Sequence, residues 1–369
     1  MILKLVNAIS LHNGGGLTYL FFLKEYLDKK GNILILDHRI KNKISFTNSR
    51  VLFIKRGLFR NFRIFFIRFI FYFISIFKYK KNKNKIIEIY LNGIPPFLRF
   101  PNSKIYIFCQ NRLVFQKYQK IKSLNLSLIQ TNLIIVISKI LFNLFIRNSD
   151  EIIVQTPSMK NLITKFLENK ITFQNDIWGE YDSKALKRII NYNKKVNNKE
   201  LENYLYNLKK NNIVFFYPAC YFQHKNHKNL IKAFNLLTHK NIKSHKLIFT
   251  FNQNELKNKS ITDNKNIIFL GHLNYFDILN TYKFVDYLVF PSLSESYGLP
   301  LLEAKINKVK IIASNLPYVL DVCFETSCKT MYVSSATIAA LTFAKLANRL
   351  NIHNWDFYMK ESPKEFGYF

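Results

Sequence analysis

The sequence predicts an α/β protein with two Rossmann-like domains, on three observations. A length of 369 residues is enough for two hydrophobic cores. The chain opens with a short apolar strand (2–10), a Gly-rich turn (11–16), an amphipathic helix (17–31) and a second apolar strand (32–39), the order of a parallel βαβ unit. The same alternation restarts after a charged stretch at 176–210.

Further apolar runs extend this pattern through both halves of the chain. In the first half, strands are expected near 85–93, 103–111 and 150–158, the last followed by a helix at 159–169. In the second half, strands are expected at 212–219, 245–252, 266–273, 286–292 and 310–316, with helices at 225–237, 275–285 and 298–307. We therefore place one domain at 1–178 and the other at 179–350.

Composition narrows the possible partners and compartment. Lys and Arg number 55 against 23 Asp and Glu, a net charge of +32. The cations are scattered, and Asn, Ile, Phe and Tyr are enriched with Lys, as an A+T-rich coding sequence would produce, so nucleic-acid binding is not predicted. An anionic membrane surface is the better partner. The four cysteines form no CxxC pair, which indicates free thiols in a reducing cytoplasm.

Two apolar segments interrupt the strand pattern. Residues 56–85 carry a 14-residue apolar run from Ile64 to Phe77, broken by Arg68 and flanked by cations. This run is short for a bilayer span, so it indicates either a helix lying in a membrane interface or a helix buried on the sheet. Residues 124–147 are longer, but their Asn, Gln and Lys side chains favour a core helix.

The first candidate site is the stretch FPSLSESYGLPLLEA, residues 290–304, which follows a predicted strand. Its helix should start near Gly298–Pro300, with Glu295 on the loop and Glu303 about one turn inside the helix. Ligands of open α/β sheets collect at such strand ends, and two carboxylates could accept hydrogen bonds from sugar hydroxyls. A solvated loop acid and a favourable first-turn helix charge are the alternatives.

The second candidate site is YPACYFQHKNHKNL, residues 217–230, again between a strand and a helix. Lys225 could neutralise a diphosphate and stabilise it as a leaving group, or it could be one more surface lysine. His224 and His227 could share a helix face, but no third ligand is near, so no metal site is predicted.

The third candidate is the HNGGGLTY turn after the first strand, where glycines would let the backbone approach a ligand. It lacks the GxGxxG dinucleotide fingerprint, although Asp37 ends the second strand, where a ribose-binding acid would be expected. A nicotinamide-dependent oxidoreductase therefore stays a weak alternative.

These motifs together resemble the retaining nucleotide-sugar glycosyltransferases of the GT-B fold, the large family four. ESYGLPLLEA matches the E-x7-E motif of that family, YPACYFQHKNHKNLIKAF resembles its phosphate-binding segment, and GGGLTYL resembles its N-terminal Gly loop. The resemblance is strong over 212–322 and moderate over 1–40 and 150–165. It implies two Rossmann-like domains facing each other across a cleft, and a C-terminal helix at 351–369 that returns to the first domain.

The resemblance also implies roles for particular residues. Glu303 would bind the nucleotide ribose, Glu295 would contact the donor sugar, and Lys225 would bind the diphosphate. The donor would further be lined by Ser296, Tyr297, Gly298, Leu299 and Gly271, with Gly15 and Gly16 approaching from the other domain. Such enzymes usually retain anomeric configuration without a protein nucleophile, a cofactor or a bound metal.

The sequence departs from the family pattern at Cys220, at the strand end 110–112 and in the region after Asp321, which lacks the usual acidic, Gly-rich residues. Family members often carry Arg five residues before the phosphate-binding Lys, where this chain has Cys220. The strand end where many members place an acceptor-side His has Asn111 and Arg112, and His12 precedes the glycines. These three residues are candidates for the acceptor or phosphate side, and Cys220 keeps open a catalytically silent GT-B binding protein.

The function that the resemblance implies is sugar transfer. We expect a cytoplasmic hexosyltransferase, peripherally bound to the inner face of the cytoplasmic membrane. It would move a hexose from a UDP- or GDP-linked donor to a lipid-linked or surface-polysaccharide acceptor, as in lipopolysaccharide, O-antigen or capsule assembly. The acceptor part rests on residues 56–85 and on the resemblance, not on the E-x7-E motif.

Overall fold

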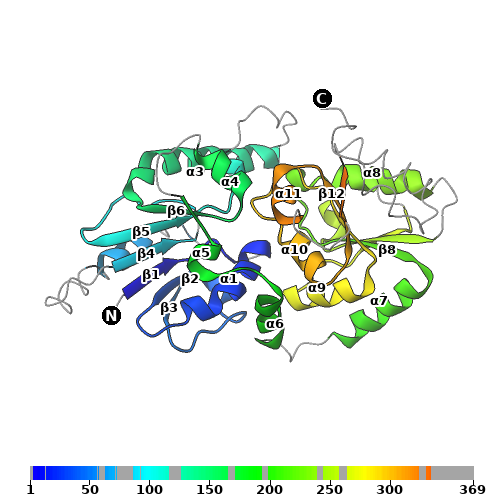
Figure 1. The fold of residues 1–369 in the computed structure, drawn as a ribbon, viewed down its shortest axis with the longest axis horizontal. Coiled ribbons are helices and arrows are strands. Elements are labelled where there is room, and N and C mark those ends of the chain that lie inside the picture. The colour runs from blue at the N-terminus through cyan, green and yellow to red at the C-terminus, as the bar shows by residue number, and fades with distance from the viewer. Residues whose placement is uncertain are drawn as a thin grey trace. The chain divides into compact units, whose positions relative to one another are not determined.

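The structure is a computed structural model in which the chain divides into two units, Met1–Tyr181 and Asp182–Phe369 (Figure 1). It describes residues 3–12, 14–55, 57, 63–70, 72, 86–91, 93–115, 126–164, 171–192, 198–238, 244–256, 264–323 and 330–333. The sequence places the domain boundary between 178 and 179. The predicted C-terminal helix at 351–369 lies outside the described residues.

Both units contain a parallel sheet, as the alternation of apolar strands and helices predicts. The first sheet has the strand order β3-β2-β1-β4-β5-β6-β7 within the described residues. Its strands are β1 (Leu3–Asn7), β2 (Ile33–Asp37), β3 (Arg50–Ile54), β4 (Ile86–Tyr90), β5 (Ser103–Phe108), β6 (Glu151–Val154) and β7 (Ile171–Phe173). The sequence analysis does not predict β3 or β7, which are the two edge strands and are less buried than the centre.

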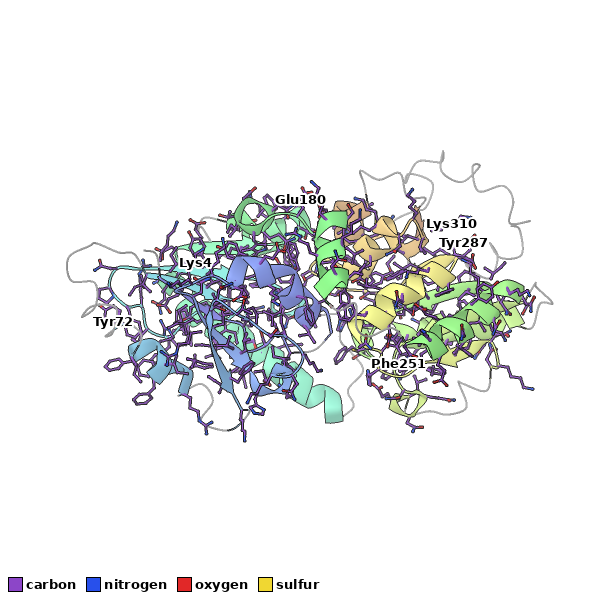
Figure 2. The ribbon with its side chains drawn as sticks, turned by 90° about the horizontal axis from the view of Figure 1, so that it is seen from below. Lys4, Tyr72, Glu180, Phe251, Tyr287 and Lys310 are labelled. Carbon is purple, nitrogen blue, oxygen red and sulfur yellow. The ribbon has the colours of Figure 1, made fainter. Side chains whose placement is uncertain are left out.

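Helices cover both faces of the first sheet. They are α1 (Gly14–Leu27), α3 (Leu126–Phe145), α4 (Pro157–Thr164) and α5 (Asn175–Trp178), together with helical residues 63–70. Phe108 of β5 stacks on Tyr19 of α1, whereas Ile107 clusters with Phe142 of α3. Because successive strand residues point to opposite faces, α1 and α3 cover opposite faces of the sheet. Figure 1 shows α3 above the strands and α1 below them, and Figure 2 is the view from below.

For the segment 56–85, the sequence predicts either a helix in a membrane interface or a helix buried on the sheet. Within it, the helical residues 63–70 pack on the sheet. Ile64 packs into the core formed by β1, β2, β3 and β4, and Arg68 makes a buried ion pair with Glu88 of β4 at 2.8 Å. The opposite side of the helix is exposed, with Phe66, Phe69 and Ile70 all accessible to solvent. The helix is therefore packed on the sheet along one side only.

The prediction of a core helix at 124–147 is correct for one side of α3. Phe142 is buried, but Ile137, Ile140 and Leu144 are exposed, because these three lie on the side turned away from the sheet. Within the described ranges, no helix is both long enough and apolar enough to cross a bilayer.

The second sheet has the order β10-β9-β8-β11-β12-β13 within the described residues. Its strands are β8 (Ile213–Tyr217), β9 (His245–Phe249), β10 (Ile267–Phe269), β11 (Tyr287–Phe290), β12 (Lys310–Ser314) and β13 (Thr330–Val333). Its helices are α6 (Ser183–Tyr192), α7 (Lys199–Asn211), α8 (His227–Thr238), α9 (Tyr275–Thr281), α10 (Leu299–Ile306) and α11 (Pro317–Cys323). In Figure 1, α7 and α9 lie on one side of this sheet and α8 on the other.

The strand order of the second sheet determines where a ligand site is expected. From β8 the chain builds outward to β9 and β10, and from β11 it builds in the other direction to β12 and β13. β8 and β11 are thus neighbours from which the topology runs in opposite directions. Open α/β sheets bind ligands beyond the carboxyl ends of the strands at such a switch point.

Candidate functional site

The loops that follow β8 and β11 bring together the two residues that the sequence singles out as catalytic. The ammonium of Lys225, in the short 3-10 helix Gln223–Lys225, lies 2.5 Å from Oε1 of Glu295, in the loop after β11. Both side chains are largely buried, exposed by 18% and 14%. Residues 70 positions apart in sequence therefore form one ion pair at the switch point of the sheet.

Backbone contacts hold the two loops against each other. The amide of Leu293 donates to the carbonyl of His224 at 2.7 Å, and the side-chain amide of Asn226 donates to the carbonyl of Pro291 at 3.3 Å. The hydroxyl of Tyr217, the last residue of β8, donates to the carbonyl of Lys225 at 2.8 Å. Asn226 has a left-handed backbone (φ 62°), which lets the chain turn from the Lys225 loop into α8.

Ser292 is a site residue that the sequence analysis misses. Its hydroxyl lies 2.6 Å from Oε1 of Glu295, and its carbonyl accepts a hydrogen bond from the hydroxyl of Tyr318 at 2.7 Å. Glu295 is thus oriented by Ser292 on one side and by Lys225 on the other. Its position three residues before Glu295 in a strand-to-loop turn is a signal that could have indicated it.

The predicted donor-binding loop leads directly into α10. Gly298 has a left-handed backbone (φ 82°), and a Cβ atom there would lie 2.9 Å from Cδ1 of Leu301, so the turn favours glycine. α10 then begins at Leu299, with Pro300 in its first turn, as the Gly-Leu-Pro sequence predicts. Ser296 and Tyr297 precede this turn on the same loop.

Glu303 lies one turn inside α10 and is buried, with only 3% of its surface exposed. The hydroxyl of Tyr275 donates to its Oε1 at 2.8 Å, and the hydroxyl of Tyr282 donates to its Oε2 at 3.1 Å. Burial raises the pKa of Glu303 to about 7, although the two tyrosine hydrogen bonds act in the opposite direction. The first turn of α10 contains no acidic residue, so the alternative of Glu303 as a favourable first-turn helix charge is wrong.

Glu303→Gln is expected to change how stability depends on pH. Below pH 4.5 both folded and unfolded chains hold the proton of Glu303, and between pH 4.5 and about 7 only the folded chain holds it. Stability therefore falls as pH rises through this window, by about 3 kcal/mol for this group. In urea denaturation, Glu303→Gln should match the wild type near pH 4 and exceed it by about 3 kcal/mol at pH 8.

The control for this experiment is Glu200→Gln, which changes an exposed acid in the first turn of α7. Its free energy of unfolding should stay within about 1 kcal/mol of the wild type at both pH values, because a charge in an exposed first helical turn contributes about that much or less. A Glu303→Gln variant that follows the wild-type pH profile would mean that Glu303 is already ionised at pH 5 in the folded chain.

Two loops at the ends of β9 and β10 adjoin this region. A Cβ atom on Gly271, which also has a left-handed backbone (φ 72°), would lie 2.9 Å from Oδ1 of Asn252. His272 contacts Glu255 at 2.8 Å. Cys220, in the loop after β8, is half-buried, and burial raises the pKa of its thiol, so it stands there as a neutral group.

Of the two histidines beside Lys225, His227 is a core residue and His224 is half-buried. His227 is 1% exposed and packs among aromatic rings, with the ring of Tyr217 at 4.8 Å and that of Phe251 at 4.9 Å. Burial lowers the pKa of His227 to about 3 and that of His224 to about 4, so both are neutral at pH 7. In the described part of the chain, no group of three or more His, Cys, Asp or Glu side chains could hold a metal ion.

The three consecutive glycines that the sequence analysis places in a turn, Gly14–Gly16, lie instead in the first turn of α1. The helix starts at Gly14, so Gly15 and Gly16 belong to it, and a Cβ atom on Gly16 would lie 3.3 Å from Cδ2 of Leu11. His12 lies in the loop before α1, after the end of β1. As in the second unit, this is the switch point of the sheet, between β1 and β4.

The carboxylate of Asp37 forms an ion pair with Arg39. Arg39 donates two hydrogen bonds to its carboxylate, at 2.8 and 2.7 Å, and this contact lowers the pKa of Asp37 to about 2. A ribose-binding acid must offer its oxygens to the two ribose hydroxyls. Arg39 contacts both carboxylate oxygens here, and the weak nicotinamide-dependent alternative rests on the position of Asp37 alone.

The remaining first-unit candidates lie after β5. Asn111 caps the short 3-10 helix Arg112–Val114 by accepting from the amide of Leu113 at 3.1 Å. The guanidinium of Arg112 donates to the hydroxyl of Ser158, at the start of α4, at 3.1 Å. Asn111 thus has a local structural role, while Arg112 presents a cation at the carboxyl ends of β5 and β6.

The architecture and the site define a class of protein. Two Rossmann-like units with parallel sheets are the architecture of the GT-B fold, which solved structures of glycosyltransferases share. Residues 198–344, within the second unit, match the family model of glycosyl transferases group 1. No curated protein sequence matches the chain.

Solved structures show the same fold across almost the whole chain. HepE of Anabaena, in complex with UDP and glucose, has a TM-score of 0.59 at 13% identity and covers 95% of this chain and 89% of its own. A glycosyltransferase from Rickettsia africae has a TM-score of 0.61 at 15% identity, with 95% and 89% covered. Sucrose-phosphate synthase from Thermosynechococcus elongatus has a TM-score of 0.58 at 12% identity, with 94% and 90% covered.

Proposed function

We propose that this protein is a retaining glycosyltransferase of family four. It transfers a hexose from a UDP- or GDP-linked donor to a lipid-linked or surface-polysaccharide acceptor. The observation that carries the proposal is the ion pair of Lys225 and Glu295 at the switch point of the second sheet, next to the helix that holds Glu303. The match of residues 198–344 to group 1 glycosyltransferases supports it.

The proposed roles follow from the chemistry of each group. Lys225 binds the donor diphosphate and stabilises the negative charge that grows on it as it leaves. Glu295, released from Lys225 by the incoming phosphates, accepts hydrogen bonds from the hydroxyls of the donor sugar. Glu303 accepts hydrogen bonds from the nucleotide ribose. Ser296, Tyr297, Gly298, Leu299 and Gly271 line the donor, with Gly15 and Gly16 on the diphosphate side.

The proposed reaction needs no cofactor and no metal ion. The bond between the anomeric carbon and the phosphate oxygen breaks, and a bond from that carbon to an acceptor hydroxyl oxygen forms. The electron pair of the broken bond stays on the diphosphate, and the leaving phosphate oxygen takes up the hydroxyl proton. His12, Asn111 and Arg112 are proposed for the acceptor or phosphate side, and Arg112 supplies the cation there.

We further propose that the enzyme works at the inner face of the cytoplasmic membrane, where a lipid-linked acceptor would be held. Its pathway would be lipopolysaccharide, O-antigen or capsule assembly. Residues 56–85 support this setting, because they combine a long apolar run with nine Lys and Arg and no acidic residue.

A binding titration tests the proposal. UDP or GDP should give a saturable calorimetric signal with the full-length protein. At pH 8, where Glu303 is ionised, Glu303→Ala should weaken this binding about tenfold, because hydrogen bonds to a charged acceptor are each worth about 1.5–3 kcal/mol. NAD should give no signal. Binding of NAD without binding of UDP or GDP would overturn the proposal in favour of a nicotinamide enzyme.

One observation favours a second candidate. Cys220 is a neutral thiol at the position where the related family often has a phosphate-binding Arg, so Lys225 is the cation of its loop that can meet the diphosphate. A catalytically silent GT-B protein that binds a nucleotide sugar or a partner would follow. Nucleotide binding without release of nucleotide from any donor, in the presence of acceptor lipids, would establish this candidate.

A further inference from the structure

The exposed apolar residues of the first unit gather on one face. Eight large hydrophobic side chains are exposed in its described part, by 41% to 64%. They are Phe66, Phe69, Ile70, Phe97, Leu98, Ile137, Ile140 and Leu144. Three come from the helical residues 63–70, two from the loop after β4, and three from α3. We call these eight residues the apolar face.

The strand register shows that the two helices lie on the same side of the sheet. Glu88 of β4 pairs with Ile105 of β5, so their side chains point to the same face. Arg68 reaches Glu88 on that face, and Phe142 of α3 clusters with Ile105 there. The sides of both helices that turn away from the sheet consequently face in the same direction.

The loop after β4 joins the two helices into one surface. The rings of Phe65 and Phe97 are 4.8 Å apart, and Arg68 donates to the carbonyl of Leu98 at 3.0 Å. On the other side, the side chain of Asn148, just after α3, donates to the carbonyl of Phe97 at 3.1 Å. The apolar face therefore runs from the helical residues 63–70 across this loop toward the end of α3.

The inward ion pair explains why the apolar side chains point outward. In an isolated amphipathic helix Arg68 would face water and its apolar neighbours would face the core. Here Arg68 is held inside by Glu88, whose carboxylate also accepts from the hydroxyl of Tyr90 at 2.7 Å. The pair fixes the rotation of the helix and leaves Phe66, Phe69 and Ile70 exposed.

The charge around the apolar face is predominantly positive, although Arg99 beside it is paired with Asp150 at 2.7 Å. Residues 38–149 contain 22 Lys and Arg but a single acidic residue, Glu88, which is buried. The whole chain, in comparison, has 55 Lys and Arg against 23 Asp and Glu. Arg63, Arg99 and Arg147 are exposed beside the apolar residues. An exposed apolar surface of this kind marks an interaction site, and its surroundings select an anionic partner.

We propose that the apolar face is the surface by which the protein binds an anionic lipid bilayer. The aromatic and aliphatic side chains enter the boundary between headgroups and acyl chains, and the surrounding cations meet the lipid phosphates. A second copy of the chain fits less well, because a symmetric contact would place cations against cations. The apolar face would be the surface through which the proposed enzyme associates with the membrane, and this role rests on the proposed function.

Vesicle co-sedimentation of the full-length protein tests the surface. Wild type should bind vesicles of phosphatidylcholine with phosphatidylglycerol and should bind pure phosphatidylcholine far less. The variant Phe66→Ser, Phe69→Ser, Ile70→Ser should bind the anionic vesicles at least about tenfold more weakly. The matched control, Tyr204→Ser, Tyr206→Ser, Ile190→Ser, removes two exposed aromatic side chains and one Ile from the second unit and should bind as wild type.

A single replacement keeps the test independent of folding. In Phe69→Trp the new indole should be quenched by brominated lipid in anionic vesicles, beyond the quenching of the native tryptophans in wild type. The inference is overturned if wild type ignores anionic vesicles, if the triple variant binds as wild type, or if the new indole is not quenched. It is also overturned if wild type sediments as a dimer without lipid and the triple variant as a monomer.

Membrane binding and nucleotide binding can be measured independently of each other. Vesicle binding is measured without nucleotide, and nucleotide binding is titrated without vesicles. Vesicle binding without UDP or GDP binding would overturn only the proposed function, and the reverse result would overturn only the membrane surface.

Discussion

Replacing either Glu295 or Lys225 by Ala is expected to lower the rate of sugar transfer about a hundred- to a thousandfold. Lys225 stabilises charge on the leaving diphosphate, and Glu295 orients the donor sugar, so each contributes most in the transition state. Because the two side chains are paired at 2.5 Å, the double variant should lose less than the product of the two single losses. Initial rates of nucleotide release with a fixed acceptor measure all three variants.

The same strand offers a matched control. Asp286 and Lys209 form an ion pair at 3.4 Å at the opposite end of β11, away from the carboxyl edge of the sheet. Asp286→Ala and Lys209→Ala should keep the wild-type rate within about threefold, because an exposed pair contributes about 1 kcal/mol or less. Wild-type turnover in both Glu295→Ala and Lys225→Ala would show that the site lies elsewhere.

Replacing Arg68 by Met is expected to destabilise the chain by about 3–5 kcal/mol. Arg68 and Glu88 are 3% and 2% exposed, so the variant leaves the Glu88 carboxylate buried, with the Tyr90 hydroxyl as its remaining hydrogen-bond partner among the described residues. An uncompensated buried charge costs far more than the pair itself contributes. Urea denaturation at pH 7, followed by circular dichroism, measures the loss.

Two further variants test this explanation. Arg68→Met with Glu88→Gln removes both charges and should recover most of the lost stability. Arg99→Ala breaks the exposed pair of Arg99 with Asp150 and should cost about 1 kcal/mol or less. Equal losses for Arg68→Met and Arg99→Ala would contradict the assignment of Arg68 and Glu88 as the contact that orients the helix.

The fold could be predicted from the sequence because its signals are local. Each central strand is a run of apolar residues, and the Gly-Leu-Pro sequence before α10 sets a left-handed turn and a helix start. The edge strands β3 and β7 escape prediction because partial exposure dilutes their apolar pattern. The start of α1 is misplaced because glycine normally disfavours a helix, whereas tertiary packing retains Gly14–Gly16 in its first turn.

The candidate site could be predicted only in part. Lys225, Glu295 and Glu303 each follow a strand and lie in motifs with recognisable spacing. Tyr275 and Tyr282, which bind Glu303, have no such signal, because each could equally be a core aromatic residue. The contact of Arg68 with Glu88, 20 residues later in the sequence, depends on how the helix packs on the sheet. Helical periodicity alone would place Arg68 toward solvent.

The central claim is that the pair Lys225–Glu295 forms the donor site of a glycosyltransferase. Its most direct test incubates the protein with a panel of UDP- and GDP-linked hexoses and lipid-linked acceptors, and measures the release of UDP or GDP. The account predicts release from at least one donor by wild type, by Asp286→Ala and by Lys209→Ala, and its loss in Glu295→Ala and Lys225→Ala. Release that is undiminished in Glu295→Ala and Lys225→Ala would contradict it.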